Sequence, residues 1–194
     1  MKFTKIPTDA FQKLQINAGM LTTVFTPATG TIGEAGQIGA TTGGVNFTAT
    51  PTYSDFGEDI DNCPKNMKEL KRLDSWEAKM TGTFINADTK IAKSLCGAAD
   101  VGTSDGKVTP RNDLSDADFA DIWLVGDYSD KNGDKNGGFI AIHLMNALST
   151  GGFQLQTSDK AKGQFAFEYT AHYSMAAQDT VPFEIYIKAG TAEG

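Results

Sequence analysis

The chain has little of what enzymes and metalloproteins use for chemistry. Its 194 residues include only two histidines and two cysteines. Cys63 and Cys96 lack the CxxC spacing of zinc and redox sites, and two cysteines cannot form a disulfide framework. His143 and His172 have no HxH or HExxH partner. The sequence therefore predicts no metal, no cofactor and a reduced, intracellular setting.

Positive charge and long apolar runs are also scarce. Lys and Arg number 17 against 24 Asp and Glu, which gives a formal net charge of −7. This balance argues against a surface that grips nucleic acid through its phosphates. No stretch approaches the length of a transmembrane helix, and the first residues carry no apolar run typical of a signal peptide. We expect assembly in the cytoplasm and no membrane partner.

The residues that are present favour β-structure. The 21 glycines indicate many turns, and a 40% hydrophobic content is enough for a real core. Apolar and polar residues alternate with period two over several segments, which is typical of half-buried strands. With no linker and no internal repeat, residues 1–194 are predicted to form one domain. The predicted strands lie within 16–25, 43–53, 75–85, 119–128, 138–148, 163–174 and 181–188.

One helix and three less regular segments complete the expected fold. Ile91 and Leu95 form an apolar stripe after a capping residue, Asp88, and Gly97 suits the helix stop. Residues 1–15 are expected to form an N-terminal arm, and residues 26–44 and 52–66 two long loops. The predicted fold class is mainly β, a β-sandwich or barrel with one flanking α-helix.

The predicted strand at 138–148 is apolar on both faces. Ile140 and Ile142 alternate with Phe139 and Ala141. A strand of this kind needs cover on both sides, as in sheets buried on both faces. One face belongs to the core, and we expect either the helix or another subunit to cover the other.

The stretch before that strand resembles the start of a calcium-binding EF-hand loop. Asn132, Asp134 and Asn136 place side-chain oxygens at alternate positions, and Gly137 follows. The first position is not Asp, however, and the twelfth is His143 rather than a bidentate Glu. Because Asn-Gly sequences accept positive φ, the stretch is instead predicted to be the polar tip of a β-hairpin.

No group of residues stands out as a catalytic site. Glu168 and His172 share one strand face four residues apart, a spacing too long for direct contact. The carboxylates between residues 113 and 121 could supply an acid–base pair, but acidic residues before a strand are usually solvated. We therefore expect a protein that is not an enzyme.

Several segments together resemble a known family. The runs "GGVNFTATPTYSDFGEDIDNCPKNMKELKRLDSWEAKMTGTFI", "KVTPRNDLSDADFADIWLVGDYS", "GGFIAIHLMNALSTGGFQLQTSDKAKGQFAFEYTAHYS" and "VPFEIYIK" are similar to the major tail tube protein of long-tailed, siphovirus-like bacteriophages of Gram-positive bacteria. The similarity covers about residues 43–188, and no single motif in it is diagnostic.

The resemblance implies a structural virion protein. Tail tube proteins are β-sandwiches related in fold to type VI secretion tubes; six copies form a ring, and rings stack into a hollow tube that carries the genome during ejection. The implied partners are further copies of the chain, a tape measure protein and double-stranded DNA in the lumen without specific binding, and the terminator and distal tail proteins at the tube ends. The implied location is the tail of the virion.

The resemblance also suggests roles for particular residues. The acidic loop is expected to contact a neighbouring subunit or ring, and the glycine-rich loop at 30–44 is expected to do the same. Strands with small polar faces are expected to line the lumen. The contact candidates are Asp55, Phe56, Glu58, Asp59 and Asp61, and the lumen candidates are Asn46, Thr48 and Thr50.

Two other classes of function remain open. The first is a carbohydrate-binding or adhesion-type β-sandwich module, which would present exposed aromatic residues on a concave face. The second is a jelly-roll enzyme, which would need a convergent pair of acidic residues.

Overall fold

The chain is mainly β with a single α-helix among the residues described. The computed structural model describes residues 5–7, 9–128 and 138–190. Short 3₁₀ turns lie at Ala10–Lys13, Glu34–Gly36 and Asp116–Asp118. The elements are β1 (Gln15–Thr22), β2 (Phe25–Thr26), β3 (Thr31–Ile32), β4 (Thr41–Asp55), β5 (Lys71–Phe84), α1 (Thr89–Cys96), β6 (Ala99–Val101), β7 (Val108–Pro110), β8 (Ala120–Tyr128), β9 (Phe139–Ser149), β10 (Gln154–Gln156), β11 (Gln164–Thr170) and β12 (Phe183–Lys188).

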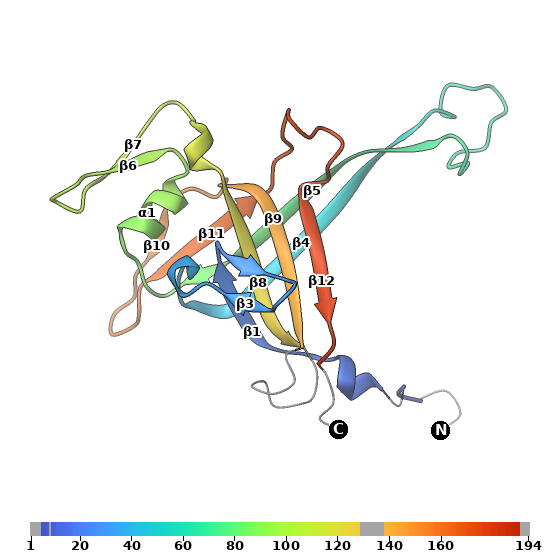
Figure 1. Ribbon diagram of the computed structural model, residues 1–194. Coiled ribbons are helices and arrows are strands. Elements are labelled where there is room, and N and C mark those ends of the chain that lie inside the picture. The colour runs from blue at the N-terminus through green and yellow to red at the C-terminus, as the bar shows by residue number, and fades with distance from the viewer. Residues whose placement is uncertain (1–4, 8, 129–137, 191–194) are drawn as a thin grey trace.

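The main sheet is antiparallel and divides into two groups of strands. Its order is β1-β8-β9-β11-β5-β4, with β12 paired to β9 and β10 paired to β11. The first part of β9 pairs with β12, whereas its end, at Leu148 and Ser149, pairs with β11. Strand β9 therefore joins a front group, β1-β8-β9-β12, to a rear group, β4-β5-β11-β10, and the two groups cross in Figure 1.

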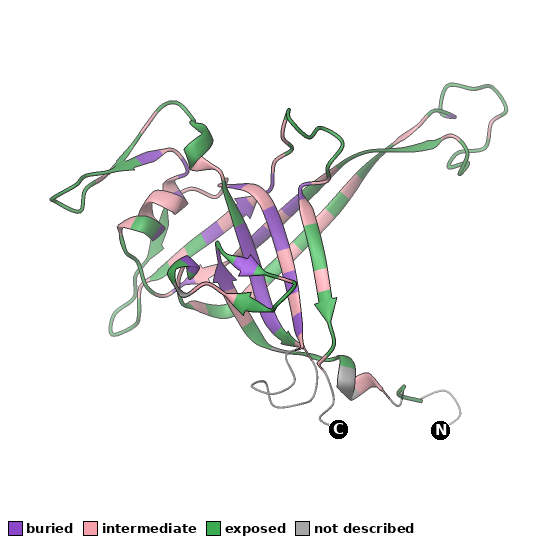
Figure 2. Cartoon of the chain, in the orientation of Figure 1, coloured by how far each residue is buried: buried purple, intermediate pink, exposed green. Residues whose placement is uncertain are grey.

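The core lies between these two groups and the helix. The front group contributes Leu124 and Leu144, the rear group contributes Met80 and Tyr169, and all four are at most 6% exposed. The alternation predicted for residues 76–84 is confirmed, since the buried residues of β5, Ala78, Met80 and Phe84, all lie on the predicted apolar face. Figure 2 shows this buried zone at the crossing. The full cluster is Leu21, Ala78, Met80, Phe84, Ile91, Leu95, Ile122, Leu124, Leu144, Ala147, Phe167, Tyr169 and Ala171.

The helix begins and ends where the sequence predicts. The Asp88 side chain accepts a hydrogen bond from the backbone N–H of Ile91, which satisfies one of the free donors at the helix start. Gly97 ends the helix with φ of 76°. Ile91 and Leu95 are the buried residues of α1. The hydroxyl of Ser94 also bonds that of the buried Tyr169 at 2.8 Å, which ties the helix to β11.

The second apolar face of β9 is covered by the chain itself. Phe139 and Ala141 pack in a second buried cluster with Phe25, and the Phe25 ring meets the Phe139 ring edge-on at 5.1 Å. The expectation that α1 or another subunit covers this face is therefore wrong: the cover is the β2–β3 hairpin, seen in front of β8 and β9 in Figure 1.

The two predicted loops are also corrected. Residues 26–44 contain the end of β2, β3, a 3₁₀ turn and the start of β4, because Phe25 and Ile32 bury their side chains against the front group. Residues 52–66 begin inside β4, which runs to Asp55 and pairs with β5 over its whole length. The predicted hairpin between β8 and β9 is confirmed by their antiparallel pairing. The tip of this hairpin, with Asn132 and Asp134, lies outside the described residues. Residues 1–4 of the predicted N-terminal segment also lie outside them.

Truncating Phe25 to Ala should test this cover. The substitution removes a ring that is 7% exposed and contacts Trp123 at 5.4 Å between centroids. We expect the free energy of unfolding to fall by about 3 kcal/mol, as for other large-to-small core changes. Urea denaturation followed by tryptophan fluorescence measures it. Val24→Ala, at a side chain that is 53% exposed, is the matched control and should change stability little.

Candidate interaction surfaces

The longest feature outside the core is a projecting two-stranded arm. We use the name arm for residues 52–74, which comprise the end of β4, the connection and the start of β5. Figure 1 shows the arm extending well beyond the crossing of the two strand groups. An isolated pair of strands is only marginally stable in water. The arm therefore needs either its own internal order or a partner surface.

The tip of the arm is ordered by Asp55. Its carboxylate accepts hydrogen bonds from the backbone N–H of Gly57 at 2.9 Å and of Asn66 at 2.8 Å. These two bonds, with smaller contributions from nearby lysines, hold the pKa of Asp55 below its usual value. The thiol of Cys63 and the side chain of Leu70 pack so close to Gly57 that a Cβ there would lie 3.1 Å from each. The tip is therefore an ordered turn, stabilised by hydrogen bonds and side-chain packing within the arm.

The five predicted contact residues separate into two kinds. Asp55 is half-buried and its carboxylate is engaged inside the arm, so its role is structural. Phe56 is 59% exposed, and Glu58, Asp59 and Asp61 are exposed as well. These four side chains are free to meet another surface.

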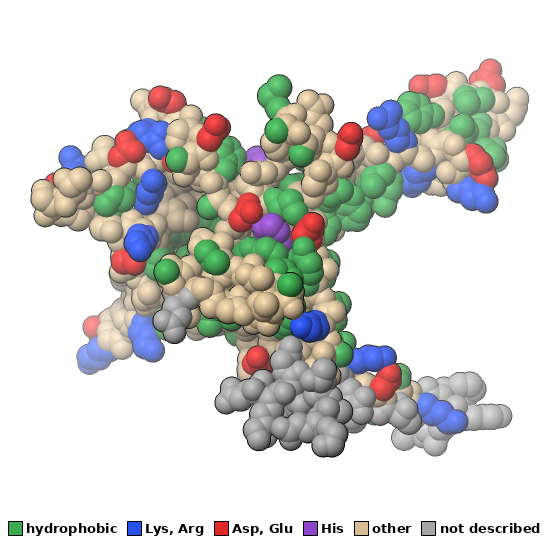
Figure 3. Space-filling model, in the orientation of Figure 1, with side chains coloured by type: hydrophobic (Ala, Val, Ile, Leu, Met, Phe, Trp, Pro, Cys, Tyr) green, Lys and Arg blue, Asp and Glu red, His purple; other side chains and the backbone are tan. Residues whose placement is uncertain are grey.

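The arm carries an apolar face that the sequence analysis missed. Tyr53 and Leu73 are direct cross-strand partners, 51% and 45% exposed. The register shifts beside them, so that Asp74 is an extra residue in β5. This bulge keeps Leu73 on the same side as Trp76, and the apolar inner face of β4 and β5 continues past the core. Figure 3 shows hydrophobic side chains gathered along the arm, whose other exposed apolar residues are Phe56, Ile60 and Met67.

A second overhanging face lies on the front group. Ile185 and Ile187 of β12 pair with Ile142 and Ile140 of β9, which places all four side chains on one side of the two strands. We call these four residues the isoleucine face. Ile185 is 52% exposed and Ile187 59% exposed, although the alternation in β12 predicted a half-buried strand face. The rear group does not extend over them.

The three predicted lumen residues do share one polar, exposed face. Asn46, Thr48 and Thr50 alternate with partly buried residues of β4. Their neighbours on β5 are Thr81, Lys79 and Glu77, so the polar face continues across the rear group. Lys79 bonds the carboxylate of Glu77 at 2.7 Å and lies 3.8 Å from Glu168 on β11. The lysine of this face is thus paired with carboxylates, and these three residues together carry one net negative charge.

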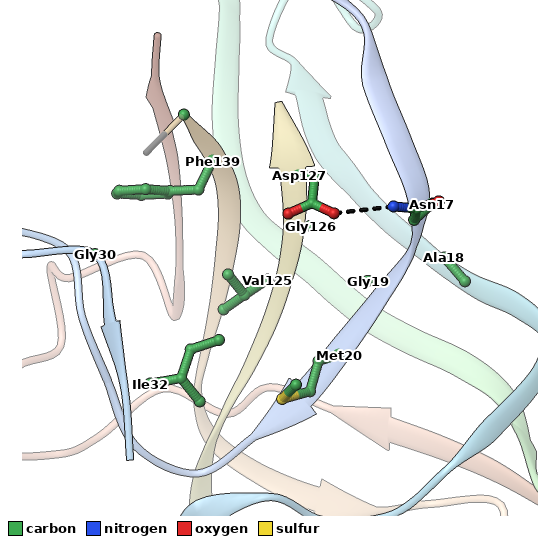
Figure 4. A pocket seen from close by; sticks show the side chains of 11 residues that line it. Asn17, Ala18, Gly19, Met20, Gly30, Ile32, Val125, Gly126, Asp127 and Phe139 are labelled. Atoms are coloured by element: carbon green, nitrogen blue, oxygen red, sulfur yellow. Dashed lines mark hydrogen bonds between the residues drawn. The ribbon is translucent and has the colours of Figure 1, made fainter. Parts of the chain in front are cut away.

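A shallow pocket opens between the β1–β8 strands and the β2–β3 hairpin. It has a volume of about 400 Å³, and Met20, Ile32 and Phe139 form its apolar wall in Figure 4. Its two polar side chains bond each other, since the Asn17 amide donates to the Asp127 carboxylate at 2.9 Å. The described lining of the pocket therefore contains one carboxylate, which accepts a hydrogen bond from Asn17, and no acid–base pair.

His143 and Asp118 each contact side chains from other segments of the chain. His143 stacks on Trp123 at 3.8 Å between centroids, with Asp121 at 3.1 Å from one ring nitrogen and Glu184 at 3.7 Å from the other. Asp118 caps a 3₁₀ turn through the N–H of Ser115 and also binds Arg111 at 2.6 Å, and both bonds lower its pKa.

Neither the ligands of a metal nor a membrane span is found in the described part of the chain. Over residues 5–7, 9–128 and 138–190, no three His, Cys, Asp or Glu side chains cluster as a metal site would require. No helix in the same ranges is long and apolar enough to cross a membrane. Comparison of the sequence with protein-family models and with curated proteins finds no match.

Replacing Asp55 with Ala should loosen the tip of the arm. The two backbone donors lose their acceptor, and we expect the amide resonances of Gly57 and Asn66 to move toward values typical of unbonded N–H groups. Asp61→Ala, at an exposed carboxylate, should leave both resonances in place. Nuclear magnetic resonance measures the shifts.

The same bonds should depend on pH in a defined direction. Because the folded-state pKa of Asp55 lies below its unfolded value, the stabilisation is complete above the unfolded pKa and is lost as pH falls through the folded pKa. The wild-type amide shifts of Gly57 and Asn66 should therefore hold at neutral pH and move only at acidic pH. Movement near neutral pH would contradict this role.

Proposed function

We propose that the chain is a self-assembling structural subunit of a tube, the tail tube of a long-tailed bacteriophage, with rings of six copies stacked into a conduit for the genome. The observation that carries this proposal is the arm. An ordered tip and a continuous apolar face project from the rest of the chain. Exposed apolar surface of this kind is typical of interaction sites, and another copy of the chain would cover it.

The polar face supports the same proposal. Asn46, Thr48 and Thr50 are exposed on a long strand whose neighbours carry threonines and paired charges. A wall of this kind offers DNA few unpaired cations, so the phosphates would pass without being held. The net charge of −7 acts in the same direction. We assign this face to the lumen of the tube.

The strand edges also favour assembly. Among the described strands, β4 is paired only with β5, and β12 only with β9. Unpaired edges are prone to uncontrolled association, and closure into a ring is one way to cover them. The fold would then be a β-sandwich whose edges are completed by neighbouring subunits in the ring.

The alternative classes have less support. A carbohydrate-binding module would use exposed aromatic residues on a concave surface, whereas the two most exposed aromatic residues among those described, Tyr53 and Phe56, lie on a projecting arm. A jelly-roll enzyme would need a convergent acid pair at a pocket. Asp121 and Glu184 lie on either side of His143, but neither lines the pocket in Figure 4, which contains a single carboxylate among its described residues.

Deletion of residues 55–61 should leave a soluble protein that forms no tubes. We expect the wild-type protein to form rings or tubes of uniform diameter in negative-stain electron microscopy. A deletion variant that assembles like the wild type would refute the role of the arm, and a wild-type protein that stays monomeric at all concentrations would refute the proposal itself.

A point substitution sharpens this test. Phe56→Ser removes an apolar side chain that is 59% exposed and should weaken assembly without lowering the melting temperature. Leu114→Ser is the matched control, because Leu114 is 56% exposed but lies outside the arm. Equal assembly of the two variants would count against contact through Phe56.

A further inference from the structure

Two apolar faces extend beyond the core in different directions. The first, which we call the arm face, consists of Tyr53 and Leu73 on the inner side of β4 and β5. The second is the isoleucine face on the inner side of β9 and β12. The most exposed member of each, Tyr53 and Ile187, is 51% and 59% exposed.

These two faces belong to strand pairs that already pack on each other within one chain. The ring of Phe183 on β12 lies 5.7 Å from that of Phe47 on β4 and 5.5 Å from that of Trp76 on β5. Beyond Trp76 the rear pair continues as the arm face. Beyond Phe183 the front pair continues as the isoleucine face. The overhangs are therefore extensions of a packing that exists at the crossing.

One chain cannot bring its own two overhangs together. In Figure 1 the arm leaves the crossing toward the upper right, whereas β12 runs from the crossing toward the bottom of the view. A second copy can supply the missing half, since its arm face has the same strand pair and the same kind of side chains that meet Phe183 in the first copy. We infer that the arm face of one copy packs on the isoleucine face of the next.

This inference rests on the proposed self-assembly and specifies its contact. Each copy gives one arm face and receives another on its isoleucine face, so the interface is heterologous and passes from copy to copy until a ring closes. The arm of the neighbour also covers strand β12, whose only described strand partner is β9. This contact removes the apolar surface of the aromatic and branched aliphatic side chains from water, which stabilises the association.

Cross-linking between two singly labelled chains tests the contact. In a background with Cys63→Ser and Cys96→Ser, one preparation carries Leu73→Cys and the other Ile187→Cys. The two are mixed as dilute protein, concentrated, and treated with a short bismaleimide. We expect a 73–187 cross-linked pair, identified by mass spectrometry, at a yield several times that of a control mixture with Leu114→Cys in place of Ile187→Cys.

A charge substitution gives a second readout. Ile187→Asp places a carboxylate in the proposed contact, and we expect the concentration needed for assembly to rise roughly tenfold or more. Leu114→Asp should leave it within about twofold. Both residues are exposed in the single chain, so both variants should keep the wild-type melting temperature.

The outcomes separate this inference from the proposed function. Tubes that form normally with Ile187→Asp, or equal cross-linking of the two mixtures, would overturn the inference while the tube proposal stands. A wild-type chain that never assembles would overturn both. Selective 73–187 cross-linking together with impaired assembly of Ile187→Asp would support the contact.

Discussion

The contact of Phe183 with Phe47 and Trp76 is the point on which the arrangement of the chain depends. Here, away from the pairing of β9 with β11, the front strands pack on the rear strands, and the Phe183 ring centroid lies 5.7 Å from that of Phe47 and 5.5 Å from that of Trp76. Antiparallel strands on the two sides of a core usually overlap along most of their length. Here they cross, and each pair continues past the crossing alone.

Because the two strand groups cross, the arm and the end of β12 extend beyond the core. This extension explains the bulge and the hydrogen-bonded tip of the arm. The bulge at Asp74 keeps Leu73 on the apolar side of the arm, where no described strand of the front group opposes it. The network around Asp55 gives the tip a fixed shape before any partner arrives. A surface that is ordered in advance loses less entropy on association than a flexible loop. In the proposed assembly, the single chain would thus carry both halves of the contact between copies before it associates.

Much of this fold could be predicted from the sequence, because strong local signals coincide with the elements. Alternation identified β4, β5, β11 and β12, the hairpin signal at Asn-Gly identified β8 and β9 as its flanks, and the caps at Asp88 and Gly97 located α1. The polar face of Asn46, Thr48 and Thr50 was also predicted, since strand periodicity alone determines which side chains share a side.

The remaining features depend on packing between distant segments. Strands β2 and β3 have two residues each, too few to show any periodicity, so the cover of Phe139 was missed. The bulge at Asp74 breaks the alternation of β5, so the predicted strand began at Trp76 and its continuation into the arm, from Lys71, was missed. Alternation placed Ile185 and Ile187 on one face, but their exposure depends on where the opposing strands end, which no local pattern contains.

Hydrogen–deuterium exchange of dilute and assembled protein tests the central claim most directly. If neighbouring copies cover the two overhangs, peptides from the arm and from β12 should become protected together, over the same range of protein concentration. Protection elsewhere, with the arm and β12 exchanging as fast in the assembled protein as in the dilute one, would contradict the account.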